Sequence, residues 1–366
     1  MKPKKRPYVI HFLAIKTLSH LSIKTSLGLK HETSSDSVEV AKGPLSQIGL
    51  LKKYKFMLKI VGRNSLKQEI YQRSFESDGI GNFMLKIPLQ ESFNDLAILQ
   101  LYEVAQFPGL EISLGSYFPI ELINNKKIII CDFDKTLVET RYATSMDVFH
   151  SLTRPVDFFP SIPNSLTLLK DYIEKGYHPF ILSASPHFYE KTIRDWLYQN
   201  KIYTAGIFLK DYRNIFSISE GILAPKDIKL QGLYKLNHLL DILLMVGMPQ
   251  SLVLIGDHFE SDLLIYLILE KMLNSDLSPA QLWNKVKGLD SFKLTTKQDG
   301  QFLNKIYQIK GLTKKQDNQE TPQLQTKIYI RKRSNETAND RLPNFLSHSI
   351  NKVEFYNADA AGRISS

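Results

Sequence analysis

The pattern of hydrophobic positions changes about one third of the way along this chain. In the first third, apolar and polar residues alternate with a period of two, for example over residues 54–60, which is typical of strands with one buried face. Turn-forming residues, such as those at 77–82, separate the expected strands. We therefore predict a small all-β sandwich over residues 18–122.

Residues 1–17 combine a basic start with an apolar run from Tyr8 to Ile15. A signal peptide has the same outline, but His11 interrupts the run, Lys16 ends it, and no small-residue cleavage site follows. We interpret this segment as a basic N-terminal lead into the first strand. No apolar stretch approaches the roughly 20 residues that a membrane helix needs, so we expect no transmembrane segment.

Strands and helices alternate in the remaining part, 123–366, which indicates a parallel α/β sheet. The expected strands are 127–131, 180–182, 205–209, 252–255 and 327–331. Helices are expected between them, at 165–175, 186–199, 230–246 and 262–272. The polar residues 273–322 are rich in Lys, Gln and Asn, and we predict a partly flexible insertion there with one helix at 279–287.

Composition and charge narrow the functional classes. Hydrophobic residues make up 43% of the chain, which excludes global disorder. The formal net charge of +10 favours an anionic partner such as a phosphorylated substrate, an acidic membrane face or nucleic acid. Cys131 is the single cysteine, so the chain can form no internal disulfide, and we expect a reducing, cytoplasmic location.

Carboxylates follow the expected strands at the edge where open α/β sheets bind ligands. Asp132 and Asp134 come directly after the strand at 127–131, and Asp257 follows the fourth strand, with Asp262 five residues further on. Several carboxylates at one edge repel each other unless a cation holds them. Hard oxygen ligands without a thiolate or histidine cluster favour Mg²⁺.

Other groups at the same edge suit a phosphate. Ser183 ends the second strand just before a helix N-terminus, where phosphate oxygens bind. Lys235, near the start of the long helix at 230–246, can neutralise the phosphate, and Lys226 and Lys229 stay open as alternatives. One carboxylate can attack phosphorus while a second transfers protons. Together these groups point to phosphoryl transfer.

Several neighbouring residues have simpler interpretations. We interpret Cys131 as a packing residue beneath the site, and Lys210 and Arg213 as parts of a solvated loop. The basic run at 331–333 is interpreted as a solvated face. His187 stays open between a position over the site and a surface position.

The motifs also carry a resemblance to a known superfamily. DFDKT at 132–136, ILSAS at 181–185, the helical Lys235 and GDHFESD at 256–262 resemble the four motifs of the haloacid dehalogenase (HAD) superfamily. Within it, the strings ILSASPHFYEKTIRDWL, AGIFLKD, GDHFESDLLIY and KIYIR are similar to actin-patch-type phosphatidate phosphatases, which are related to the lipins. The resemblance covers about 125–335 and implies a HAD-like Rossmannoid parallel sheet with a minimal cap.

The resemblance implies a role for each matching residue. Asp132 would be the nucleophile, and Asp134 the general acid and base, with its backbone carbonyl on the metal. The implied Mg²⁺ ligands are Asp132, Asp134, Asp257 and Asp262. The residues implied to bind the substrate phosphate are Thr136, Ser183, Ala184 and Lys235. Lys135 departs from the family's usual DxDDT, and His258-Phe259 replace its small pair in the fourth motif.

The leading hypothesis is a Mg²⁺-dependent phosphatase that hydrolyses a lipid phosphomonoester, specifically phosphatidate, as a peripheral protein at a membrane surface. The spacing of the motifs leaves no room for a large cap, and an uncapped site suits a phosphate on something large. One alternative is a HAD phosphatase of a nucleic-acid end, a phosphoprotein or a soluble metabolite. The other is a non-catalytic module that binds phospholipid. Nucleic acid is the less favoured partner, and the sequence identifies no protein partner.

Overall fold

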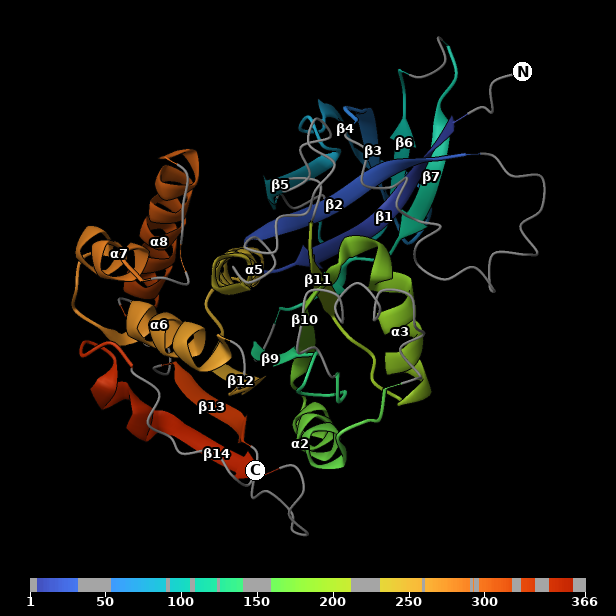
Figure 1. Ribbon diagram of the computed structural model, residues 1–366. Coiled ribbons are helices and arrows are strands. Elements are labelled where there is room, and N and C mark those ends of the chain that lie inside the picture. Colours follow the sequence, from blue (N-terminus) through green and yellow to red (C-terminus); the bar gives the residue numbers. More distant parts are fainter. Residues whose placement is uncertain are drawn as a thin grey trace, which may run out of the picture.

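The computed structural model has an all-β N-terminal part followed by a parallel α/β sheet, as Figure 1 shows. This fold class confirms the sequence-based prediction. The structure describes residues 5–31, 54–89, 93–105, 109–123, 126–140, 159–211, 231–258, 261–289, 292, 296–317, 324–332 and 342–357.

Two four-stranded sheets form the β-sandwich. The first contains, in spatial order, β5 (Asn82–Pro88), β2 (His20–His31), β1 (Lys5–Lys16) and β8 (Ile120–Glu121). The second contains β4 (Glu69–Glu76), β3 (Met57–Asn64), β6 (Leu96–Glu103) and β7 (Ile112–Tyr117). Apolar side chains from both sheets meet in one core, among them Leu21, Ile23, Leu58, Ile60 and Leu99. The period-two alternation places these side chains on the inner faces.

The first strand begins at Lys5, inside the segment that the sequence analysis set apart as a basic lead. Both faces of this strand are covered. Ala14 lies in the sandwich core, whereas Leu13 and Ile15 lie in a core shared with the α/β sheet. A strand covered on both faces has a nearly continuous apolar sequence, which is why this run resembled a signal peptide in outline.

The α/β part is built on a six-stranded sheet in which every paired strand is parallel. Its spatial order is β11 (Gly206–Lys210), β10 (His178–Pro186), β9 (Lys127–Asp132), β12 (Ser251–Asp257), β13 (Gln325–Lys332) and β14 (Val353–Asn357). The central strand β9 reads KIIICD and is buried along most of its length, as expected when helices cover both faces.

Helices cover the two faces of this sheet. One face packs against α2 (Pro163–Glu174) and α3 (Glu190–Gln199), which follows the short 3₁₀ turn His187–Tyr189. The other packs against α5 (Gln231–Val246) and α6 (Asp262–Asn274). A second 3₁₀ turn, Ser347–Lys352, precedes β14. No described helix is both long enough and apolar enough to cross a bilayer.

The polar segment 273–322 contains two helices rather than the one that its sequence predicted. The predicted helix is α7 (Pro279–Lys287), which begins with a capping box formed by Ser278 and Gln281. The second is α8 (Thr296–Asp317). Its sparse apolar residues have helical spacing and are buried: Phe302, Ile306 and Ile309. Phe302 stacks on Trp283 of α7 with ring centroids 5.2 Å apart. The high polar content of the segment hid this narrow apolar stripe.

Candidate active site

The predicted site residues gather at the carboxyl edge of the parallel sheet. Strand β9 ends at Asp132, beside Leu182 of β10. On its other side, β12 ends at Asp257. The neighbouring carboxyl ends of parallel strands therefore bring together motifs that lie far apart in the sequence.

Three buried carboxylates form the centre of this edge. Asp132, Asp257 and Asp262 offer ligand atoms that all lie within 4.8 Å of one another. Asp262 opens α6, where the helix dipole favours a negative charge, and its Oδ2 accepts the backbone N–H of Asp257 at 3.2 Å. Gly256 permits this approach, because a Cβ there would lie 2.7 Å from the Asp262 side chain.

Lys235 of α5 reaches the same carboxylates. Its ammonium lies 2.7 Å from Oδ1 of Asp132 and 2.5 Å from Oδ1 of Asp262, and all three side chains are fully buried. The cluster contains three carboxyl groups, including that of Asp257, and one ammonium group. With all four groups ionised, its formal charge is −2. Buried carboxylates require further neutralisation, and a divalent cation with a preference for hard oxygen ligands fits this donor set.

The side chain of Asp134 contacts β10, on the other side of β9 from β12. Its Oδ2 accepts a hydrogen bond from Ser183 Oγ at 2.6 Å, and Ser185 Oγ lies at 3.5 Å. Ser183 Oγ in turn accepts the backbone N–H of Ser185 at 3.0 Å, around the half-buried Ala184. The side chain of Asp134 is therefore outside the group of three carboxylates. Its expected metal contact through the backbone carbonyl stays a prediction.

The loop after β9 is held in an unusual shape. Lys135 has a positive φ of 58°, a conformation that residues with a Cβ seldom adopt. Thr136 Oγ1 donates to Asp132 Oδ2 at 3.3 Å. Arg331 of β13 donates to the Lys135 carbonyl and to Glu139, each at 2.5 Å. These contacts fix the position of the segment that carries both aspartates of the first motif.

The side chain of Arg331 is 3% exposed, which corrects the interpretation of this residue as part of a solvated face. Arg333 of the same run lies outside the described residues. Lys210 is likewise buried at the end of β11, with its ammonium 5.4 Å from the ring centre of Tyr234, and is not part of a solvated loop. A signal was available for both residues. Each directly follows the apolar residues of its strand, near the edge where the acids lie.

Cys131 and His187, two residues near the site, are both buried. Burial raises the pKa of the Cys131 thiol well above its usual value, and the Asp132 carboxylate adds to this, so the thiol is a neutral packing group as predicted. His187 is buried, with Nδ1 3.6 Å from Asp211, which corrects the surface alternative. The residues Arg213, Lys226, Lys229 and Phe259 lie outside the described ranges.

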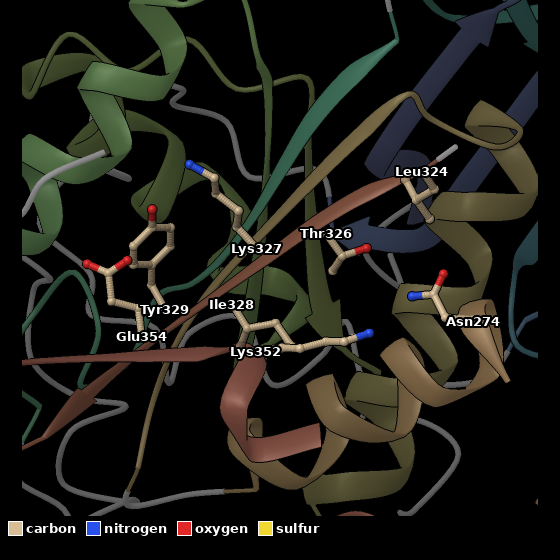
Figure 2. Close-up of a pocket in the computed structure, with 8 residues that line it drawn as sticks. All are labelled: Asn274, Leu324, Thr326, Lys327, Ile328, Tyr329, Lys352 and Glu354. Carbon is tan, nitrogen blue, oxygen red and sulfur yellow. The ribbon is translucent and has the colours of Figure 1, made fainter. Parts of the chain in front are cut away.

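A cavity of about 600 Å³ lies elsewhere on the α/β domain, as Figure 2 shows. It is lined by Asn274, Leu324, Thr326, Lys327, Ile328, Tyr329, Lys352 and Glu354. These residues surround the first half of β13, whereas Arg331, near the other end of that strand, contacts the loop after β9. The cavity contains none of the predicted site residues.

The structure thus brings together a buried carboxylate cluster, a lysine and a serine of β10 at one edge of a parallel sheet, as the resemblance to HAD-like phosphatases implied. Residues 127–276 match the family model described as "Phosphatidate phosphatase APP1, catalytic domain". Over these residues the chain is therefore similar to the APP1 catalytic-domain family, which confirms the predicted resemblance there. The remaining part of the predicted range, 277–335, lies outside the match. The matched segment contains all eight predicted site residues.

Comparisons with curated proteins and with solved structures add no functional argument. No curated protein matches the chain. The chain resembles a chain of the Pnkp1/Rnl/Hen1 complex with 15% identity, a TM-score of 0.25, and coverage of 42% of this chain and 50% of the other. It resembles a β-glucuronidase of Parabacteroides merdae with 10% identity, a TM-score of 0.26, and coverage of 89% and 34%. The chain thus spans half or less of these solved chains, and such low TM-scores bear on neither fold nor function.

Proposed function

We propose that this protein is a Mg²⁺-dependent phosphatase that removes the phosphate of a lipid phosphomonoester, specifically phosphatidate, at a membrane surface. The observation that carries this proposal is the buried cluster of Asp132, Asp257, Asp262 and Lys235. It lies within the segment that matches the APP1 catalytic domain. The net charge of +10 fits a substrate in an acidic lipid surface.

In the proposed reaction, a carboxylate oxygen of Asp132 attacks phosphorus and the bond from phosphorus to the lipid oxygen breaks. Asp134, in its protonated form, gives its proton to the leaving lipid oxygen. The products of this step are an aspartyl-phosphate on Asp132 and the lipid alcohol. Asp134 then accepts a proton from water, whose oxygen attacks phosphorus, so that phosphate leaves and the Asp132 carboxylate is restored.

The other side chains of the edge have supporting roles in this proposal. Ser183 and the backbone at Ala184 would donate to the phosphoryl oxygens, and Thr136 would support Asp132. Lys235 would balance the negative charge that the phosphate brings. Asp132, Asp257 and Asp262, with the backbone carbonyl of Asp134, would hold Mg²⁺. The ion would supply the charge that screens the phosphoryl oxygens from the attacking carboxylate.

The helices between the strands of the sheet support the proposal of a large substrate. Within the described residues, single helices join the strands of the parallel sheet from β9 to β12, and no folded cap domain stands between them. A site without an enclosing cap would suit a phosphate that remains attached to a bilayer lipid, because the rest of the lipid cannot be enclosed.

The test is phosphate release from phosphatidate in mixed micelles, with and without Mg²⁺. We expect Mg²⁺-dependent release that falls by about 1,000-fold or more in Asp132→Asn, since this change removes the nucleophile. Asp195→Asn is the matched control, because Asp195 lies exposed on α3 and should leave the rate unchanged.

An aryl phosphate and an oligonucleotide with a terminal phosphate are assayed in parallel. Preferred turnover of either one would keep the chemistry and contradict the lipid assignment. Liposome binding that survives Asp132→Asn, with no turnover of any substrate by the native protein, would instead indicate a phospholipid-binding module.

A further inference from the structure

The β-sandwich contacts the catalytic part of the chain mainly through α5, the helix that carries Lys235. Figure 1 shows α5 beside the ends of β1 and β2. Leu13 and Ile15 of β1 pack in the same core as Leu236, Leu239 and Leu240 of α5. The contact therefore includes buried apolar surface as well as polar bonds.

The C-terminal end of α5 is capped by the sandwich. His20 Nε2 lies 3.0 Å from the Met245 carbonyl, and Lys86 Nζ donates to the Leu244 carbonyl at 3.1 Å. The last carbonyls of a helix have no partner within the helix, and they carry its negative dipole end. Two side chains from another domain therefore supply the C-terminal cap of α5.

The middle of α5 is held by an ionic cluster. Asp241 is buried, and its carboxylate receives Lys24 of β2 at 2.9 Å and Lys305 of α8 at 2.5 Å. Burial opposes ionisation of Asp241, but the two lysines outweigh it and hold its pKa well below the usual value. Lys305 also donates to Asn237 at 2.6 Å. The helix is thus fixed between the sandwich and α8.

Near its N-terminal end, α5 carries Lys235, whose short contacts leave little room for the helix to move. Asp241 follows Lys235 by six residues, about 9 Å along a helix axis. At that end, the Lys235 ammonium lies within 2.7 Å of Asp132 and within 2.5 Å of Asp262. A shift or rotation of α5 by about 1 Å would lengthen both contacts enough to matter for catalysis.

The sandwich also borders the segments that follow β10 and β11. His11 of β1 lies 2.6 Å from Glu190, just after the 3₁₀ turn that follows the serine motif. Asn82 of β5 donates to Asp211 at 2.8 Å, directly after the end of β11. One sheet of the sandwich therefore contacts three parts of the α/β domain: α5, the start of α3 and the residue after β11.

We infer that the β-sandwich is a positioning element of the catalytic centre, and that Lys24 and Asp241 are positioning residues that hold α5 and thereby Lys235. The inference rests on the proposed function for its kinetic test. In this inference, the role of the β-sandwich is to position α5, and that role requires no ligand bound to the sandwich.

The test compares Lys24→Met with Lys59→Met in the full-length protein. Lys24→Met keeps the length of the side chain and removes its charge. We expect kcat for phosphatidate to fall by about 10-fold with KM within about 2-fold, because Lys235 would be misplaced while the phosphate contacts proposed for Ser183 and Ala184 remain. Lys24→Arg should recover most of the lost kcat.

Lys59→Met is the matched control. It removes an ion pair with Glu111, 2.5 Å long, from the other sheet of the same sandwich. We expect kcat to stay unchanged. Equal kcat in native protein and a folded Lys24→Met variant would overturn the inference, as would equal losses in the Lys24 and Lys59 variants.

A second readout does not depend on activity. Hydrogen exchange of backbone amides along α5 should be faster in Lys24→Met than in native protein, including the turn around Lys235, and unchanged in Lys59→Met. If native protein releases no phosphate, the proposed function fails, and the exchange rates in α5 still decide this inference. Lys86→Met, which removes one bond to the helix end, replaces Lys24→Met if the latter does not fold.

Discussion

Gly256 shows how the packing around a single residue places one of the buried carboxylates. It precedes Asp257 at the end of β12, and α6 begins six residues later at Asp262. A Cβ at this position would lie 2.7 Å from Asp262 and 2.8 Å from the ring of Tyr266. The glycine therefore gives α6 room to bring its first carboxylate against the strand.

Gly256→Ala tests this close approach. We expect the added methyl group to displace Asp262 from Lys235, which should lower phosphatase activity by at least about 10-fold and the free energy of unfolding by about 1–3 kcal/mol. The measurements are phosphate release and urea denaturation. Gly288→Ala is the control, because the nearest atom to its Cβ is 3.9 Å away and this C-cap residue of α7 has αR backbone dihedrals that alanine adopts. Identical behaviour of the two variants would contradict the packing argument.

Arg331 is the residue whose environment the sequence described least well. Its sequence neighbours are basic, and that suggested a solvated run. The guanidinium instead binds the Lys135 carbonyl and Glu139, nearly two hundred positions away in the chain. The planar guanidinium has several N–H donors in fixed directions, so it can bind two acceptors at once. The single ammonium of a lysine lacks this fixed geometry.

At the scale of elements, α5 is held along its whole length by other elements. His238 illustrates this, since its Nε2 lies 3.1 Å from the Leu209 carbonyl of β11 and its Nδ1 lies 3.5 Å from Lys24. A carbonyl only accepts and an ammonium only donates, so these partners require a neutral imidazole with its proton on Nε2. The sequence showed only an apolar helix with a lysine near its start.

The neutral state of His238 makes stability depend on pH. Burial lowers its pKa from 6.5 to about 3, with a further contribution from Lys24. Lys305 acts in the same direction, whereas Asp241 and the Leu209 carbonyl oppose it. The unfolded chain therefore binds a proton below pH 6.5 that the folded protein does not bind, and stability falls as the pH drops from about 6.5 toward 3.

His238→Gln should reduce this dependence, because a glutamine amide can donate to Leu209 and accept from Lys24 without titrating. We expect native protein to lose about 1–2 kcal/mol more than the variant between about pH 7 and pH 5. Urea denaturation at a series of pH values gives the measurement. His348→Gln, at an exposed position, should keep the native slope. Parallel curves for native protein and His238→Gln would rule out this histidine as the source.

At the scale of the whole molecule, the two parts of the chain share a core. Leu13, Ile15 and Leu122 lie in the same buried cluster as the apolar face of α5. Separating the sandwich from the α/β sheet would expose this surface together with the buried Asp241. The two parts are therefore expected to unfold together.

Differential scanning calorimetry tests this coupling. We expect one transition for the full chain, with the calorimetric enthalpy close to the van't Hoff enthalpy. Lys24→Met should lower the temperature of that transition without splitting it, since the apolar contacts of Leu13 and Ile15 remain. Two resolved transitions in the native protein would mean that the sandwich and the catalytic domain are independent units.

The amino-acid pattern was sufficient to predict the fold class and the carboxylates at the edge of the sheet. Strand and helix periods are local, and acids directly after buried strands can lie only at the carboxyl ends of those strands. This is why the amino-acid pattern alone was enough to select residues such as Asp132 and Asp257. The family match over 127–276 contains three of the four strings that carried the resemblance, and KIYIR at 327–331 lies outside it.

The tertiary structure decided which charged residues are buried, and by which partners. The contacts of Lys235 with Asp132 and Asp262, of Arg331 with the catalytic loop, and of Lys24 with Asp241 all join distant segments. It also decided that α8 forms, since its narrow apolar stripe gains its stability from packing on α7 and α5. Such contacts depend on how whole elements pack, and no local pattern in the sequence encodes that arrangement.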